Sequence, residues 1–357
     1  MDSGSWRVRI LAGILALVLG VVVVGYFLEG TVLGDLSAIL RQPDTAGAAL
    51  RLAVPISLAA MGGIFAEKSG VINIGIEGLL IISAFTGILV TEVVSWSGGT
   101  LAGVPAIWVG FFAGILASTL LAFLFAVICI EFKADQIIAG LAVWLVALGL
   151  APFVSIIVFG GPNSPSVGRF ATWRIPLFAD VPYLGEVLFD ARPIVYMMLV
   201  AVPVTWYVLN RTSFGKWVEA SGENPKALDT AGVSVHRVRY ASVLLSGVFS
   251  GIGGAAYALG HVGNFVGNGA TMINGRGFIA IAAYLFGNYN PFGAFGASIL
   301  FAGLDSIQIR LQQLSGYDVS AELVQAIPYV TVVVVLALVG KTVLPDAAGD
   351  HYESGEE

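Results

Sequence analysis

An acid and an amide stand in an otherwise apolar stretch, residues 66–80, which reads AEKSGVINIGIEGLL. The stretch holds three glycines, the amide and the acid: Gly70, Gly75, Gly78, Asn73 and Glu77. An acid near the centre of a membrane span costs roughly 2.5–3.5 kcal/mol on insertion scales, so it usually faces a cavity or a partner. Close helix packing explains the glycines alone, but with the acid and amide the stretch favours an unwound half-helix that lines a substrate path with Asn73, Gly75, Glu77 and Gly78.

A second interrupted stretch, residues 275–295, reads GRGFIAIAAYLFGNYNPFGAF. Its apolar piece, 278–287, is too short to cross a membrane, which takes about 20 residues. Asn288 follows in a turn, and we group it with the path residues. Residues 70–74 match 277–281 at three positions, and the two copies lie five spans apart. They would therefore run in opposite directions, as in an inverted repeat with one broken helix in each half.

The other chemical groups predict no catalytic or metal site. The histidines are scattered along the chain: His236, His261 and His351. The Gly-Lys-Thr run at 340–342 resembles the end of a phosphate-binding loop, but Val335 stands where that loop needs a glycine. We therefore expect no ATP hydrolysis by this chain and no cofactor. Asp305, a second acid near a span, either pairs with Arg310 or approaches the outer surface.

The composition places these groups in a membrane protein. Of 357 residues, 57% are hydrophobic and 11% are charged, 45 are glycine, and the mean hydropathy is +0.89. Soluble domains carry about 25% charged residues, so an ordinary soluble enzyme, a nucleic-acid binder and a disordered protein are excluded. The single cysteine, Cys129, excludes a disulfide scaffold.

The chain is predicted to be an all-α polytopic protein with about ten transmembrane helices, two of them short or broken. The apolar runs are 8–28, 46–66, 71–90, 103–130, 137–159, 191–210, 240–262, 277–287, 292–310 and 323–340. The first run exceeds the 7–15-residue core of a signal peptide, which favours an anchor helix. With both termini in the cytoplasm, the shorter, inner segments carry ten of the 17 Lys and Arg, as expected in a plasma membrane.

Three parts follow from this organisation. Residues 1–45 form an anchor helix and an outer loop, 46–341 form the transmembrane domain, and 342–357 form an acidic tail expected to be solvated and disordered. The longest inner loop, 211–239, contains a short helix at 225–231. Asn224 suits its N-cap, Pro225 its first position and Gly232 its left-handed end. So short a helix is marginal in water, so it lies on the membrane or docks into a cytoplasmic partner.

Three motifs, at 51–80, 222–235 and 275–293, resemble the permease subunits of ABC importers in the branched-chain amino acid/ribose permease family, nucleoside-type branch. The resemblance implies a second, related permease, two cytoplasmic ATP-binding subunits and an extracytoplasmic substrate-binding lipoprotein. It also implies that 223–235 is the loop that couples to the ATPases, with these residues carrying the contact: Glu223, Asn224, Pro225, Leu228 and Gly232. Trp144 departs from the family, where an asparagine is frequent.

These features together predict a membrane-spanning importer subunit for a small molecule, a nucleoside or a related simple sugar. An amino acid substrate remains open at this stage. The alternative is an ion-coupled secondary transporter in which Glu77 and Asp305 bind the coupling ion.

Overall fold

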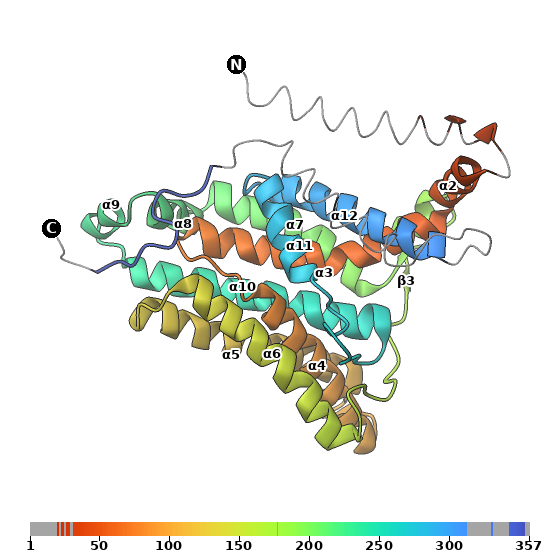
Figure 1. The fold of residues 1–357 in the computed structure, drawn as a ribbon, viewed down its shortest axis with the longest axis horizontal. Helices are drawn as coiled ribbons and strands as arrows, with labels where there is room; N and C mark the ends of the chain where they lie inside the picture. Colours follow the sequence, from red (N-terminus) through yellow and green to blue (C-terminus); the bar gives the residue numbers. More distant parts are fainter. Residues whose placement is uncertain are drawn as a thin grey trace. The chain divides into compact units, whose positions relative to one another are not determined.

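The computed structural model describes residues 20, 23–24, 26–28, 31–176, 178–312, 330 and 343–353. Its helices, labelled as in Figure 1, are α2 (Val32–Arg41), α3 (Pro43–Lys68), α4 (Ile76–Trp96), α5 (Ala106–Ala126), α6 (Gln136–Phe159), α7 (Pro193–Arg211), α8 (Ser213–Glu223), α9 (Pro225–Thr230), α10 (Val235–Tyr257), α11 (Arg276–Phe286) and α12 (Pro291–Gln312). Single π-helical turns follow α5 and α10 at Val127–Glu131 and Ala258–Val262, and a third spans Gly185–Phe189. The strands form two short antiparallel hairpins, β1 (Thr100–Leu101) with β2 (Val104–Pro105), and β3 (Trp173–Arg174) with β4 (Asp190–Ala191).

The described chain divides into two compact units. The first comprises 1–52, 173–191 and 299–341, and the second comprises 53–172, 192–298 and 342–357. In the first unit, the Ser306 hydroxyl of α12 donates to the Thr45 carbonyl of α3 at 3.0 Å. Arg310 lies 3.7 Å from the Asp44 carboxylate.

Small residues let the helices at the core of the second unit approach closely. In α10, Gly254 lies directly against the Leu80 carbonyl of α4, with no room for a side chain. Serine hydroxyls bind the backbone of α10 from two neighbouring helices. Ser83 of α4 donates to the Gly251 carbonyl, and Ser118 of α5 donates to the Gly247 carbonyl. Close backbone approach with serine cross-links is typical of membrane helices, where apolar burial alone does not hold helices together.

The outer surface of the second unit is apolar along α5 and α6. Large hydrophobic side chains there are half exposed or more: Phe112, Leu116, Leu120, Ile138, Leu145, Phe153 and Ile157. On α5 they recur every four residues and so form one face. An exposed apolar face of this length fits lipid tails or a partner helix, not water.

Within the described residues, seven helices are long and apolar enough to cross a membrane. The chain is therefore a helical, multi-pass membrane protein. The predicted run 277–287 corresponds to α11, which has 11 residues and is short, as predicted. The runs 8–28 and 323–340 lie mostly outside the described residues, so the structure does not confirm a total of about ten helices.

Part of the acidic end of the chain lies against the protein. Residues 343–353 are described and lie against the second unit, beside α8 and α9 (Figure 1). Pro345 and Ala347 are buried. The segment thus contacts the protein at these two residues, while the side chains of Asp346, Asp350 and Glu353 are exposed.

Candidate translocation and coupling site

At the place of the predicted break, residues 69–75 between α3 and α4 are non-helical, and α4 beyond them is a full-length helix of 21 residues. The non-helical segment begins at Gly70, whose φ of +93° is the left-handed conformation that favours glycine. The segment then runs back alongside α3, because Ile76 at its end packs beside Gly63. Gly63 lies five residues before the end of α3, roughly 7.5 Å along the helix axis. The break therefore carries irregular backbone into the interior of the bundle.

Buried polar side chains satisfy this irregular backbone. The Ile72 amide donates to Gln136 Oε1 of α6 at 2.7 Å, and the Ser69 hydroxyl donates to the Ala66 carbonyl at 2.6 Å. Asn73 is 2% exposed, and its Nδ2 donates to the Ser246 hydroxyl of α10 at 3.1 Å. Its Oδ1 has no hydrogen-bond partner among the described residues. An unpaired buried acceptor costs about 1–3 kcal/mol, so Asn73 Oδ1 is available to a water or a ligand.

Glu77 joins the first broken segment to the second. It is 2% exposed in the first turn of α4. Its Oε1 accepts from the Gly275 amide at 2.7 Å, and its Oε2 accepts from the Gly277 amide at 2.6 Å. These amides lie at the N-terminus of α11, where unpaired N–H groups and the helix dipole favour an anion. Because both oxygens accept from N–H groups, the geometry fits a carboxylate that caps α11.

The glycines near Glu77 are required by close backbone contacts. A Cβ on Gly277 would lie 2.6 Å from the Glu77 nitrogen and Cα, and one on Gly78 would lie 2.8 Å from the Val143 carbonyl oxygen of α6. Gly75 packs beside Asn73 Oδ1. Trp144 packs edge-on against Phe278 of α11 with ring centroids 5.2 Å apart.

The structure brings together four of the five residues assigned to the path, and separates Asn288. Asn288 follows α11 at the end opposite Glu77, which 11 helical residues place about 16 Å away. Its Oδ1 accepts from the Val343 amide at 3.2 Å. The sequence match of 70–74 with 277–281 pairs a non-helical segment with a helical one, so the two pentapeptides differ in local structure.

Sequence reasoning missed Arg276 at the start of α11. It is 9% exposed, donates from Nη1 to the Met272 and Ile273 carbonyls, and lies 4.6 Å from the centroid of the Tyr257 ring. Arg276 is the sole charged residue in 275–295, and that isolation was a usable signal. It adds a buried cation beside the amides that Glu77 caps.

The short helix predicted in the loop 211–239 is confirmed as α9. Asn224 Oδ1 accepts from the Ala227 amide at 3.0 Å, Pro225 is the first residue, and Gly232 beyond the end has a φ of +81°. Leu228 is 4% exposed and anchors the helix, whereas Glu223 is exposed. α9 is thus a capped helix with one buried side chain, Leu228.

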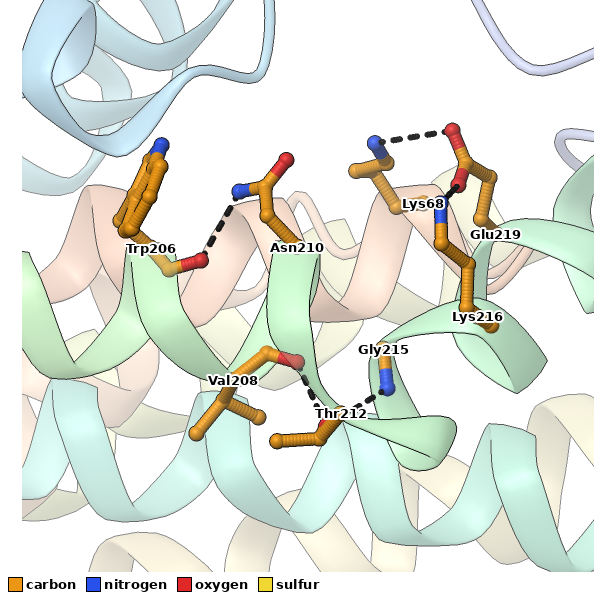
Figure 2. A network of polar contacts seen from close by, with 8 residues as sticks. All are labelled: Lys68, Trp206, Val208, Asn210, Thr212, Gly215, Lys216 and Glu219. Atoms are coloured by element: carbon orange, nitrogen blue, oxygen red, sulfur yellow. Dashed lines mark hydrogen bonds and ion pairs between the residues drawn. The ribbon is translucent and has the colours of Figure 1, made fainter.

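α8, which the sequence did not predict, connects α9 to the bundle. Figure 2 shows Thr212 as its N-cap, accepting from the Gly215 amide at 3.2 Å and donating to the Val208 carbonyl at 2.6 Å. Glu219 of α8 lies 3.7 Å from Lys68, the last residue of α3, and 3.3 Å from Lys216 (Figure 2). α8 therefore lies across the end of α3.

The end of α8 contacts the broken segment directly. The Ser221 hydroxyl donates to the Ser69 carbonyl at 2.9 Å. Gly222 packs against the Lys68 carbonyl and lies so close to Gly70 that an added Cβ would be 3.2 Å from the Gly70 nitrogen. A displacement of α8 and α9 would thus reach residues 69–75 without an intermediate element.

Comparisons with known proteins agree with this arrangement. The family model described as the branched-chain amino acid transport system permease component matches residues 45–336. The guanosine ABC transporter permease protein NupQ of Bacillus subtilis is 35% identical over 87% of this chain and 96% of its own. The nucleoside ABC transporter permease protein NupC of Lactococcus lactis is 34% identical over 84% of this chain and 93% of its own.

A putative glucose ABC transporter permease protein, TsgC13 of Haloferax volcanii, is 34% identical over 75% of this chain and 78% of its own. No solved structure matches the chain. The family match covers both broken segments, α8 and α9. The chain therefore belongs to the family of permease components of branched-chain amino acid transport systems, and it is a transport component of the ABC class rather than an enzyme.

Proposed function

We propose that this chain is the membrane-spanning subunit of a binding-protein-dependent ABC importer for nucleosides or related simple sugars. The relatives' names, which specify guanosine, nucleosides and glucose, support this substrate class. The observation that carries the coupling role is the contact of α8 with the broken segment, Ser221 with Ser69 and Gly222 with Gly70. It connects a capped surface helix to a buried irregular segment. A transporter whose energy comes from ATP-binding subunits outside the membrane requires such a connection.

The proposed topology has ten helices. It adds α11 and the runs 8–28 and 323–340 to the seven full-length helices, with 1–45 as anchor and outer loop and 46–341 as the transmembrane domain. The end that carries Lys68, α8 and α9 faces the cytoplasm, and so do both termini. The basic residues at that end support this orientation: Lys68, Lys216, Lys226, Arg237 and Arg239. The inverted repeat then rests on one break in each half, since the matched pentapeptides differ in structure.

The complete importer would contain a second, related permease, two cytoplasmic ATP-binding subunits and an extracytoplasmic lipoprotein. ATP binding closes the ATP-binding subunits and moves α9, which docks into one of them through the loop 211–239. α8 transmits the movement to residues 69–75. Asn73, the residue of this segment with a free acceptor, then changes its position beside the path as the permeases rock between outward- and inward-facing forms.

The rival mechanism assigns ion binding to Glu77 and Asp305. Both Glu77 oxygens already accept from backbone amides at 2.7 and 2.6 Å. A coupling ion would have to displace these hydrogen bonds and uncap α11. The geometry therefore favours a structural role for Glu77 over an ion site.

Uptake by the reconstituted importer tests the proposal. The Asn224→Ala variant removes the cap of α9, which stabilises a helix by about 1 kcal/mol, so we expect ATP-driven guanosine uptake to fall about fivefold. Asn210→Ala is the matched control, because Asn210 is exposed and donates to the Trp206 carbonyl on α7, away from α9 (Figure 2). We expect it to keep its uptake.

Normal uptake by Asn224→Ala and by a variant with two residues inserted into α9 would overturn the docking role. Uptake that persists without ATP under a proton gradient would overturn the importer mechanism itself. A transport rate for glucose above that for guanosine would move the substrate class toward sugars.

A further inference from the structure

Residues 343–353, which we name the C-terminal strap, bind both the broken segment and α8. The Ala347 amide donates to the Gly222 carbonyl at 2.8 Å, and the Gly349 amide donates to the Gly70 carbonyl at 3.0 Å. Ala347 is 8% exposed. Gly349 has a φ of +86°, so glycine suits this position, where the strap turns against Gly70.

The strap also binds the start of α10. The Asp350 carbonyl accepts from Arg239 Nη1 at 2.7 Å, and the Tyr352 carbonyl lies 3.1 Å from His236 Nε2, which donates as the Nε2–H tautomer. Arg239 is 3% exposed, and its Nε and Nη2 have no hydrogen-bond partner among the described residues. The strap carbonyl is therefore an important partner of a buried cation, whose desolvation would otherwise go uncompensated.

The far end of the strap reaches α9 itself. The Tyr352 hydroxyl donates to Asp229 Oδ2 of α9 at 2.9 Å. Desolvation, with the hydrogen bond to Asp229 and its charge, raises the pKa of Tyr352, so the hydroxyl keeps the proton that it donates. Glu353 forms an ion pair with Lys133, in the connection between α5 and α6.

One short segment thus contacts α9, the end of α8, the start of α10 and the broken segment. α9 buries one side chain, Leu228, and a seven-residue connection separates α3 from α4. The strap fixes α9 at Tyr352 and the break at Gly349, with the Arg239 contact between them. A segment that served only to cover apolar surface would not need polar contacts at each of these elements.

We propose that the C-terminal strap is a positioning element that holds α9 and the Gly70 turn as one body, so that movement of α9 is transmitted to residues 69–75. This inference rests on the proposed importer function. Tyr352 and Gly349 are the positioning residues, acting through Asp229 and Gly70. Without the strap, α9 would move under the ATP-binding subunits while the broken segment lagged behind, and ATP hydrolysis would continue with less transport.

The test measures guanosine molecules transported per ATP hydrolysed, in proteoliposomes that contain the complete importer. Tyr352→Phe removes the donor to Asp229 but keeps the ring, which packs 6.2 Å from the His236 ring. We expect the ratio to fall about fivefold, the effect of losing one hydrogen bond of ordinary net strength at this partly exposed position, while basal ATPase activity stays within about twofold. Tyr207→Phe is the matched control, because Tyr207 is 59% exposed on α7, and it should keep the wild-type ratio.

A chain ending at Leu344 removes most of the strap and should lose at least about tenfold in the same ratio, since several contacts go together. Accessibility of the buried Cys129 thiol reports whether each variant is folded. If the shortened chain does not fold, Tyr352→Phe decides the matter alone. A wild-type ratio in Tyr352→Phe would overturn the positioning role of the strap. A loss of uptake that is fully explained by a smaller amount of folded protein would overturn it as well. Absence of ATP-driven uptake in the wild type overturns the importer function and the strap together.

Discussion

Replacing Glu77 by glutamine tests whether this acid caps α11 or binds a ligand. The carboxylate accepts from two backbone amides, at 2.7 and 2.6 Å. Glutamine has almost the same shape, but it keeps one acceptor and turns an NH₂ group toward the other amide, so two donors face each other. Losing one charge-assisted hydrogen bond costs about 1.5–3 kcal/mol, and losing the anion at a helix N-terminus costs about 0.3–1 kcal/mol.

We therefore expect Glu77→Gln to lower the free energy of unfolding by about 2–4 kcal/mol and the Tm by about 5–10 °C. The chain offers a direct assay, since its one cysteine, Cys129, is 2% exposed and a thiol-reactive dye reports its exposure on heating. Glu92→Gln, on the same helix, is the control. Its Oε1 accepts from Trp96 Nε1 at an exposed position, and an amide oxygen can replace it, so the Tm should hardly change.

The two roles of Glu77 predict opposite combinations of results. A cap predicts a lower Tm with uptake reduced in proportion to the folded fraction. A substrate or ion site predicts an unchanged Tm with uptake abolished. The second combination would refute the assignment of Glu77 to the capping of α11.

Two further predictions concern packing and charge. Gly78→Ala should lower the Tm by several degrees, because the new Cβ would lie 2.8 Å from the Val143 carbonyl oxygen, whereas Gly149→Ala has open space and should not; equal Tm values for the two variants would contradict the packing. Lys68→Ala should change the free energy of unfolding by less than about 1 kcal/mol, because its 3.7 Å pair with Glu219 is partly exposed. A larger change that persists in high salt would show that the pair does more than a surface ion pair.

The sequence predicted the ends of α9 and the end of α3, because residues at those ends determine them. Asn224, Pro225 and Gly232 specify the start and end of α9 by their own conformational preferences. Gly70, with its left-handed backbone, ends α3 in the same way. In each case the deciding interaction lies within a few residues, so the printed sequence carries it.

Long-range partners were not predictable from the pattern. The apolar context of Glu77 showed that it needs a partner, but the amides that satisfy it lie about 200 residues away. α8 was missed because its buried face consists of small residues, Gly215, Val218, Ser221 and Gly222, and lacks the large apolar residues by which a helix is recognised. The acidic end was expected to be solvated because charged side chains prefer water. Its contacts could not be predicted from the side chains, because residues 343–353 bind largely through their backbone.

The polar residues of the broken segment can be divided by what they bind. A break in a membrane helix leaves backbone groups that lipid cannot satisfy, so neighbouring side chains must do so. Gln136 binds the Ile72 amide, and Glu77 binds the amides of the second break. Within residues 69–77, the side-chain oxygen left without a partner among the described residues is Asn73 Oδ1. Glu77 is thus bound to the backbone that joins the two broken segments, and Asn73 Oδ1 is the side-chain acceptor that these contacts leave without a partner.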